Sequence, residues 1–279
     1  MCSIHMAILP PPAILKNEVE CVRITDYRGE EAVTMKVSPN GAPGMVFHHT
    51  DGHAALEHVV THSGRSFCPP PLFLSGPVIE PSVMTYKQAA FTTVHVIFKP
   101  CALNTLFGIN ASLLAPGWVG PQEYGALDLA SQLMEARSGQ EQMALLTTFL
   151  LTLLKQAKPR DLLVEESLRL IDMHIGSLRV KDLLNTFHLS ERQFERRFRQ
   201  VVGLTPQAYL RVKRFNAAIH LIKTRRFARL TDVAAALHFT DQSHLIHDIK
   251  AFSGMTPTRL AQQVDDFYHE QAGYAFVRR

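Results

Sequence analysis

The sequence predicts an α+β protein with a strand-rich amino-terminal half and an entirely helical carboxyl-terminal half. The chain has 279 residues, which is enough for two domains. Its charge is divided unevenly, because residues 1–159 hold 10 lysines and arginines against 12 acidic residues, whereas residues 160–262 hold 17 against 10. Fourteen of the 16 prolines come before residue 160. This contrast indicates two domains with different roles.

The composition excludes several classes of protein. With 46% hydrophobic and 19% charged residues, the chain has an ordinary globular mix and is too apolar to be mostly disordered. Its longest apolar stretch, residues 143–154, is shorter than the roughly 20 residues that a membrane span needs. No secretory signal is recognisable at the amino terminus. We therefore expect a cytoplasmic protein with no membrane partner.

The amino-terminal half is predicted to form short strands and then two helices. Runs rich in valine, isoleucine, phenylalanine and threonine alternate with turn signals, a pattern typical of a barrel or a two-sheet roll. The two helices have broad apolar faces, so they are expected to pack against the sheet or a second subunit. The strands are predicted at residues 19–26, 32–38, 45–49, 57–61, 72–75 and 92–99, and the helices at 126–137 and 140–156.

The carboxyl-terminal half contains an internal repeat with an offset of about 50 residues. Each copy consists of a short helix, a tight turn and a second helix, and closes with a Gly-x-x-Pro sequence, at Gly203–Pro206 and Gly254–Pro257. Glycine suits the end of a helix and proline suits the first turn of the next. Helices are predicted at residues 161–174, 180–187, 191–201, 206–224, 231–237, 242–252 and 257–267.

The second helix of each copy is predicted to have one apolar face and one polar face. Ser190 and Asp241 stand where a side chain can cap the first backbone N–H groups. Phe194 and Phe198 are four residues apart, so they share the face that packs into a core. A helix with an arginine-bearing outer face has the size and chemistry that the major groove of DNA admits.

These features resemble the double helix-turn-helix domain of the AraC/XylS family of transcription regulators. The resemblance covers residues 161–262 and includes both closures and the segments 214–222, 239–245 and 250–257. It implies two subdomains joined by one long helix at 206–224. It also implies two recognition helices in successive major-groove faces of double-stranded DNA, about 34 Å apart.

The resemblance also implies which side chains contact DNA. Base contacts are expected from the exposed faces of the two recognition helices, and phosphate contacts from two flanking cations. The candidates for base contact are Arg192, Glu195 and Arg196 in the first copy and Gln242, Ser243, His244 and His247 in the second, with Arg199 and Lys250 for phosphate.

Four positions depart from the family pattern, one of which is Leu184 in place of a usual alanine. His188 and His238 occupy turn positions where glycine is frequent, and histidine can adopt the left-handed conformation at modest cost. His247 stands where arginine is usual, so its contact to guanine or phosphate would be weaker.

The amino-terminal half resembles, more loosely, the cupin-like sensor domains of such regulators. That resemblance implies a small-molecule effector, a homodimer and RNA polymerase as a further partner. The predicted organisation is a sensor and dimerisation domain at 1–157, a linker at 158–160, the DNA-binding domain at 161–267 and a tail at 268–279. A constitutive DNA-binding factor without an effector is the main alternative.

Metal and enzyme chemistry receive less support from the sequence. Five histidines, namely His48, His49, His53, His58 and His62, occur within 15 positions, but adjacent residues of a strand point to opposite faces. We expect no metal site, no cofactor and no catalytic residues, which leaves a metal-dependent cupin or a DNA-repair fusion as disfavoured alternatives. The cysteines are far apart in sequence, so reduced thiols are expected, with Cys68 and Cys101 buried and inert.

Overall fold

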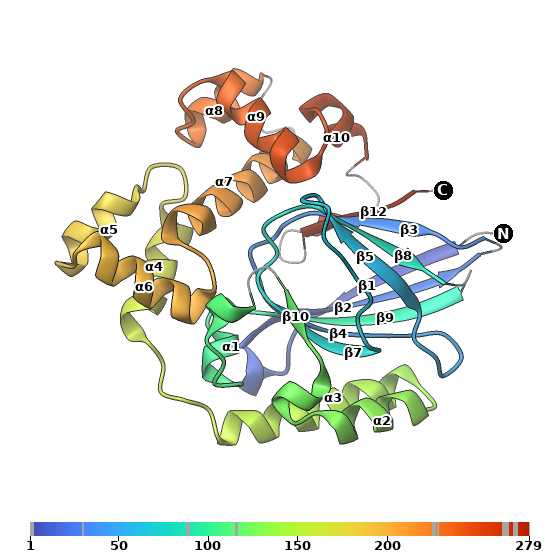
Figure 1. Cartoon of the computed structure of the whole chain (residues 1–279). Coiled ribbons are helices and arrows are strands. Elements are labelled where there is room, and N and C mark those ends of the chain that lie inside the picture. Colours follow the sequence, from blue (N-terminus) through green and yellow to red (C-terminus); the bar gives the residue numbers. More distant parts are fainter. Residues whose placement is uncertain are drawn as a thin grey trace.

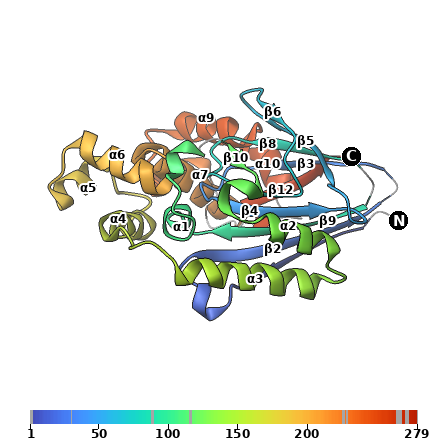
Figure 2. The same cartoon turned by 60° about the horizontal axis from the view of Figure 1, so that its bottom comes forward.

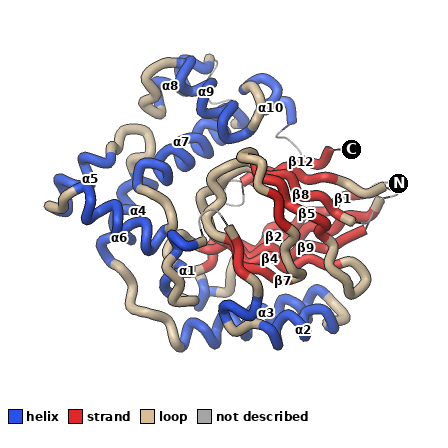
Figure 3. Tube along the Cα trace, in the orientation of Figure 1, coloured by secondary structure: helices blue, strands red, loops and turns tan. Residues whose placement is uncertain are grey.

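Strands and helices gather in largely separate regions of the molecule, as Figure 3 shows by colour. The computed structural model describes residues 3–29, 31–87, 90–114, 117–224, 227, 229–263, 268–269 and 273–278. In Figure 1 the strands form two layers, α2 and α3 lie below them, and α4 to α10 lie to the left and above. The predicted α+β class, with a strand-rich part before a helical part, is therefore confirmed.

The first sheet has six antiparallel strands in the order β1-β2-β9-β4-β7-β10. Four of them were predicted from the sequence to within two residues at each end. The others, β1 and β10, lie at the two edges and were missed. The strands are β1 (Ser3–Leu9), β2 (Val19–Arg28), β9 (Ala90–Phe98), β4 (Gly44–His49), β7 (Leu72–Ser75) and β10 (Trp118–Val119).

The second sheet has the order β11-β12-β3-β8-β5-β6. Its carboxyl-terminal strands fall within residues 268–279, which the sequence predicts to be a tail, and β12 pairs antiparallel with β3. The strands β6 and β8 were also missed, because each is short and follows a proline or turn cluster. The strands are β11 (Tyr268–His269), β12 (Gly273–Arg278), β3 (Thr34–Val37), β8 (Ser82–Tyr86), β5 (Leu56–Thr61) and β6 (Ser66–Phe67).

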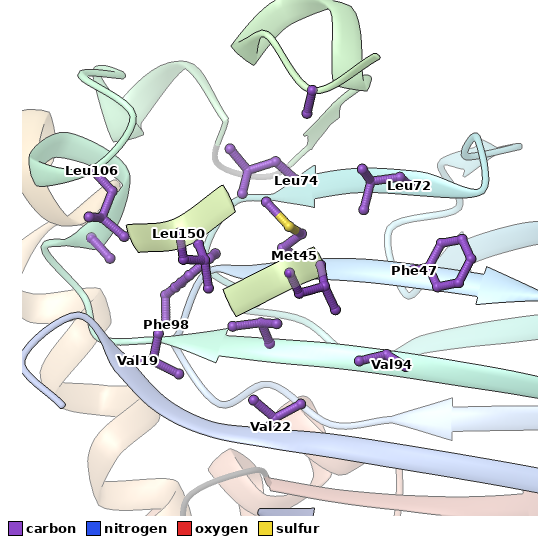
Figure 4. Packing of buried hydrophobic residues seen from close by; sticks show 14 of the residues in the cluster. Val19, Val22, Met45, Phe47, Leu72, Leu74, Val94, Phe98, Leu106 and Leu150 are labelled. Carbon is purple, nitrogen blue, oxygen red and sulfur yellow. The ribbon is translucent and has the colours of Figure 1, made fainter. Parts of the chain in front are cut away.

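Strand β4 is buried on both of its faces. Met45 and Phe47 belong to the cluster that faces the helices, whereas Val46 belongs to the cluster between the two sheets. This alternation follows from the two-residue period of a strand. Figure 4 shows the first of these clusters, which includes Met45 and Phe47 of β4 and Leu150 of helix α3 (Gly139–Lys155).

Helices of the amino-terminal part cover the outer face of the first sheet. Leu146 and Leu150 of α3 pack into the sheet core with Leu129 and Leu133 of α2 (Leu127–Glu135), so their buried face is occupied by their own sheet (Figure 2). The remaining short helices are η1 (Ala13–Leu15), α1 (Ala102–Thr105), η2 (Ala111–Leu113) and η3 (Pro121–Tyr124).

In the described residues of the carboxyl-terminal part, seven helices lie close to the predicted ranges. They are α4 (Leu162–Met173), α5 (Val180–Phe187), α6 (Glu191–Val202), α7 (Pro206–Lys223), α8 (Leu230–Ala236), α9 (Gln242–Ser253) and α10 (Pro257–Gln263). The predicted end of the last helix, at residues 264–267, lies outside the described residues. No helix in the described part of the chain is long and apolar enough to cross a membrane.

The helical part has two cores that share helix α7. The first-subdomain core lies among α4, α5 and α6 and includes Tyr209 and Leu210 of α7. The second-subdomain core lies among α8, α9 and α10 and includes Val212 and Phe215 of the same helix. Helix α7 is therefore the long connecting helix between two subdomains.

The connection between the two halves is anchored to the amino-terminal part. Residues 157–161 have no regular secondary structure. The backbone N–H of Lys158 donates to the Thr105 carbonyl at 2.9 Å, and its Nζ donates to the Gly108 carbonyl at 3.1 Å. Arg160 forms ion pairs with the buried Glu18 and with Glu165 of α4. The segment predicted as a linker is thus held on both sides.

Candidate nucleic-acid interface and interior cavity

The first helix-turn-helix unit is formed by α5 and α6. His188 ends α5 in the left-handed conformation at φ 53°, which makes the tight turn that the sequence predicted. Ser190 then caps α6, since its hydroxyl accepts from the backbone N–H of Gln193. Gly203 ends the helix at φ 89°, a conformation in which glycine has no steric cost.

Helix α6 turns its apolar side inward and its basic side to solvent. Phe194 and Phe198 are at most 1% exposed and lie in the first-subdomain core. Arg192, Arg196 and Arg199 are exposed, and Glu195 is half-buried, with one of its carboxylate oxygens 3.7 Å from a guanidinium nitrogen of Arg199. The four candidates of the first copy therefore share one face.

The second unit, α8 and α9, repeats this local geometry. His238 has φ 51° in the turn, Asp241 caps α9 by accepting from the N–H of His244 at 2.7 Å, and Gly254 ends the helix at φ 67°. The sequence therefore predicted both turns correctly at histidines that occupy the left-handed region.

Helix α9 buries Leu245 and Ile249 and exposes its candidate residues. Both apolar side chains have no exposed surface and lie in the second-subdomain core. The five candidates of the second copy are exposed, namely Gln242, Ser243, His244, His247 and Lys250. His244 is held in place, since its ring lies edge-on to Phe239 and its Nδ1 is 3.3 Å from the Thr240 hydroxyl.

An ion pair between the buried Asp248 and the exposed Arg211, which the sequence reasoning missed, holds α9 against α7. Asp248 is 2% exposed, and Arg211 donates to its two carboxylate oxygens at 2.6 to 3.1 Å. The guanidinium of Arg211 also lies 5.0 Å from the ring of Phe252. The sequence contained a signal for this ion pair. Asp248 directly precedes the buried Ile249, so an acidic residue stands on the inward face of the recognition helix.

Comparison with family models agrees with this geometry. Residues 183–263 match a family described as a helix-turn-helix domain. This part of the chain is a helix-turn-helix domain, as the resemblance to the AraC/XylS regulators predicts. Domains of this type bind DNA in transcription regulators. Residues 7–117 match a separate family, described as a domain of unknown function (DUF6597). No curated protein matches the chain.

Solved structures of regulators resemble the chain at low identity. ToxT from Vibrio cholerae is 13% identical, with a TM-score of 0.47 over 86% of this chain and 97% of ToxT. The DNA-binding domain of AdpA, in complex with a target DNA, is 23% identical, with a TM-score of 0.33 over 36% of this chain and 89% of that domain. The xylose-binding transcription activator XylR is 16% identical, with a TM-score of 0.33 over 44% of this chain and 39% of XylR.

A cavity of about 270 Å³ lies between the two sheets of the amino-terminal part. Strands of both sheets line it, and its walls are mainly apolar. Its described charged lining residues are Arg23, Arg65 and Glu80, and a guanidinium nitrogen of Arg65 lies 3.5 Å from a carboxylate oxygen of Glu80. The apolar lining includes Val37, Val46, Val59, Phe67, Phe73, Val78, Ile79, Met84 and Trp118.

Arg23 and His95 form a hydrogen-bonded pair in the cavity wall. The Arg23 Nη2 donates to Nδ1 of His95 at 3.0 Å. Burial lowers the pKa of His95 well below its ordinary value, and the charge of Arg23 lowers it further, so the imidazole is neutral near pH 7. Burial also lowers the pKa of Arg23, but a guanidinium keeps its charge in proteins.

The histidines of the 48–62 cluster do not converge. His48 is fully buried, and its Nδ1 accepts from the backbone N–H groups of Ala55 and Leu56, while its Nε2 donates to the Pro70 carbonyl at 3.1 Å. His49, on the opposite face of the strand, has its Nε2 3.1 Å from Nε2 of Gln142. Among the described residues, no group of three or more potential ligands is placed to hold a metal ion.

The sequence predicts that Cys68 and Cys101 are buried and inert, and the prediction is wrong for Cys68. Cys101 is 8% exposed, and burial raises the pKa of its thiol to about 12, as expected of an inert thiol. Cys68 is exposed, because it follows the short edge strand β6 in a proline-rich turn. Cys2 lies outside the described residues.

Proposed function

We propose that the chain is a transcription regulator that reads a specific DNA sequence with two helices, α6 and α9. The observation that carries this proposal is the duplicated geometry of the AraC-type domain. In each copy the recognition helix is capped, buried along one face and polar along the other. A single such helix could be an ordinary solvated surface, but two in tandem on one connecting helix are the arrangement that successive major-groove faces require.

The chemistry of the two exposed faces assigns their roles. Arginine donates two hydrogen bonds to guanine and glutamine pairs with adenine, so Arg192, Arg196 and Gln242 are proposed to read bases. Glu195, Ser243, His244 and His247 are proposed to contribute further base contacts. Arg199 and Lys250, in the last turns of their helices, are proposed to bind phosphates.

The cavity between the sheets is proposed as the effector site. Its walls are mostly apolar, and its charged lining residues carry one more positive than negative charge, with Arg23 on the inner wall. A small apolar molecule with one acidic group fits that chemistry, since the acid would receive charge-assisted hydrogen bonds from the guanidinium. Residues 1–157 would then be the sensor, 161–267 the DNA-binding domain and 158–160 the connection between them.

The proposed partners follow from the same role. A homodimer would place two copies on neighbouring half-sites, and the bound protein would recruit or exclude RNA polymerase. An effector that binds one domain arrangement better than another would shift the population of DNA-competent protein.

Selection of bound sequences from a random DNA pool, with the full chain, tests the proposal. The expected result is a recurrent motif with two parts, bound at least about a thousandfold more tightly than random DNA. Binding that is uniform over sequence and lost as salt rises would overturn it. A motif bound equally with and without a cell extract would instead support the constitutive factor without an effector.

A further inference from the structure

Ile79 lies where three parts of the molecule meet. Its half-buried side chain lines the cavity between the sheets. It also packs against both the first-subdomain core and the second-subdomain core. Among the described apolar side chains of the amino-terminal part, Ile79 is the one that packs against both cores. The wall of the cavity and the junction of the two DNA-reading subdomains therefore share one residue.

The junction depends on side chains that fill it. Helix α7 links the two subdomains, because it contributes side chains to the core of each. Ile175, from the loop after α4, packs against both cores as Ile79 does. Arg214 of α7 holds that loop by donating to the carbonyls of Ile175 at 3.2 Å and Leu178 at 2.7 Å. Because packed interiors deform little, these contacts define the angle between the subdomains.

The segment that presents Ile79 is itself fixed. The Gly41 N–H donates to the Val78 carbonyl at 2.9 Å, and the Gly76 N–H donates to the Gly117 carbonyl at 3.0 Å. Pro77 lies against the carboxyl end of α6, since a β-carbon on Gly203 would come within 2.9 Å of its Cγ. The segment Gly76–Ile79 thus contacts the end of the first recognition helix and the junction that orients the second.

We propose that the segment Gly76–Ile79 sets the relative placement of α6 and α9, and that Ile79 is the residue through which it positions them. The amino-terminal part of the chain then helps to determine which spacing between the two parts of the DNA motif the protein binds. A ligand in the cavity changes that preferred spacing through Ile79. This inference rests on the proposed function, because it concerns how the two helices read DNA together.

The experiment compares spacing preference between the full-length chain and an Ile79→Ala variant. Duplexes carry the selected motif with zero, one or two base pairs inserted between its two parts, each insertion moving one part by about 3.4 Å and rotating it by about 34°. The wild type is expected to lose affinity about tenfold or more on insertion, the scale of a lost base-pair contact. Ile79→Ala is expected to lose less than about threefold, while both proteins bind a duplex holding one part of the motif equally well.

Met84→Ala is the matched control, because Met84 lines the same cavity but packs against the core between the sheets. It should keep the wild-type spacing profile. Ile79→Val, which removes one methyl group, should give an intermediate profile and covers the case in which the alanine variant does not fold. The inference is overturned if the variants at position 79 keep the wild-type profile, if Met84→Ala broadens it equally, or if the wild type tolerates the insertions. Failure of the wild type to select any motif would instead refute the proposed function.

Discussion

Arg211 of the connecting helix α7 grips Asp248 of the recognition helix α9 through three hydrogen bonds of 2.6 to 3.1 Å. Asp248 is 2% exposed and precedes the buried Ile249. The residue on its other side, His247, is a candidate for DNA contact whose side chain is 76% exposed. The ion pair therefore holds the inward face of α9 against α7, while the outer face of α9 remains open to solvent.

Replacing Arg211 with methionine should lower the free energy of unfolding by about 3 kcal/mol, because it leaves a buried carboxylate without its guanidinium. Lys213→Met on the same helix is the control. Its partner Asp172 is 54% exposed, so that loss should stay below about 1 kcal/mol. Chemical denaturation measures both values. Equal losses for the two variants would contradict the structural role of this ion pair.

The left-handed turns predict opposite effects of glycine at neighbouring positions. His188→Gly should raise the free energy of unfolding by about 0.5 kcal/mol, because glycine has no steric cost at φ 53°. Thr186→Gly, one residue before the end of α5, should lower it by about 1 kcal/mol, as glycine does within helices. Thermal unfolding of both variants tests the turn. A loss of stability in His188→Gly would contradict it.

The candidate DNA contacts predict two distinguishable defects. Arg196→Ala should cost about 1–3 kcal/mol of binding free energy and relax sequence preference within the part of the motif read by α6. Arg199→Ala should weaken binding to all sequences alike and reduce the salt dependence by about one phosphate contact. Arg169→Ala, an exposed arginine of α4 paired with Glu166, is the control and should bind DNA as the wild type does. If Arg196→Ala kept full specificity, base reading by α6 would be excluded.

His48 predicts a loss of stability in mild acid. Burial lowers the pKa of His48 to about 4 from an ordinary value of 6.5. Between these values the unfolded chain binds a proton that the folded chain does not, so stability falls as the pH drops from 6.5 to 4, by up to about 3 kcal/mol. In His48→Gln this share of the pH dependence should disappear. Denaturation curves of both proteins across that range decide the matter, and parallel pH profiles would refute the assignment.

The cavity predicts a preference for acids over matched alcohols. Short aliphatic and aromatic carboxylates should raise the melting temperature of the wild type more than alcohols of the same carbon skeleton. Arg23→Met should weaken binding of the acids about tenfold or more, since a charge-assisted hydrogen bond is lost, and leave the alcohols unchanged. Stabilisation of the wild type by alcohols and acids alike would argue against a charge-selecting site.

Local sequence signals were enough to predict the helical half. The turn at His188, the cap at Ser190 and the closure at Gly203 are fixed by neighbouring residues, and the tandem repeat duplicated each signal. These local signals therefore predicted α5, α6, α8 and α9, each with boundaries within one residue of those in the structure.

Features that depend on distant residues could not be predicted in this way. Strand β12 pairs with β3 across more than 200 residues, and the strands at the sheet edges lack a distinct pattern. The pairing of Asp248 with Arg211 depends on how α9 packs against α7. The proposed role of Ile79 could not be predicted for the same reason. The sequence around a single isoleucine in a proline-rich loop does not indicate that its side chain packs against two distant cores.

Guanine-methylation interference on the selected motif tests most directly whether α6 and α9 read adjacent faces of one duplex. Methylation at N7 blocks the major groove, so the account predicts two clusters of interfering guanines about one helical turn apart on the same side of the DNA. Arg196→Ala should erase interference in one cluster and leave the other unchanged. A single cluster, or interference spread evenly along the duplex, would contradict the account.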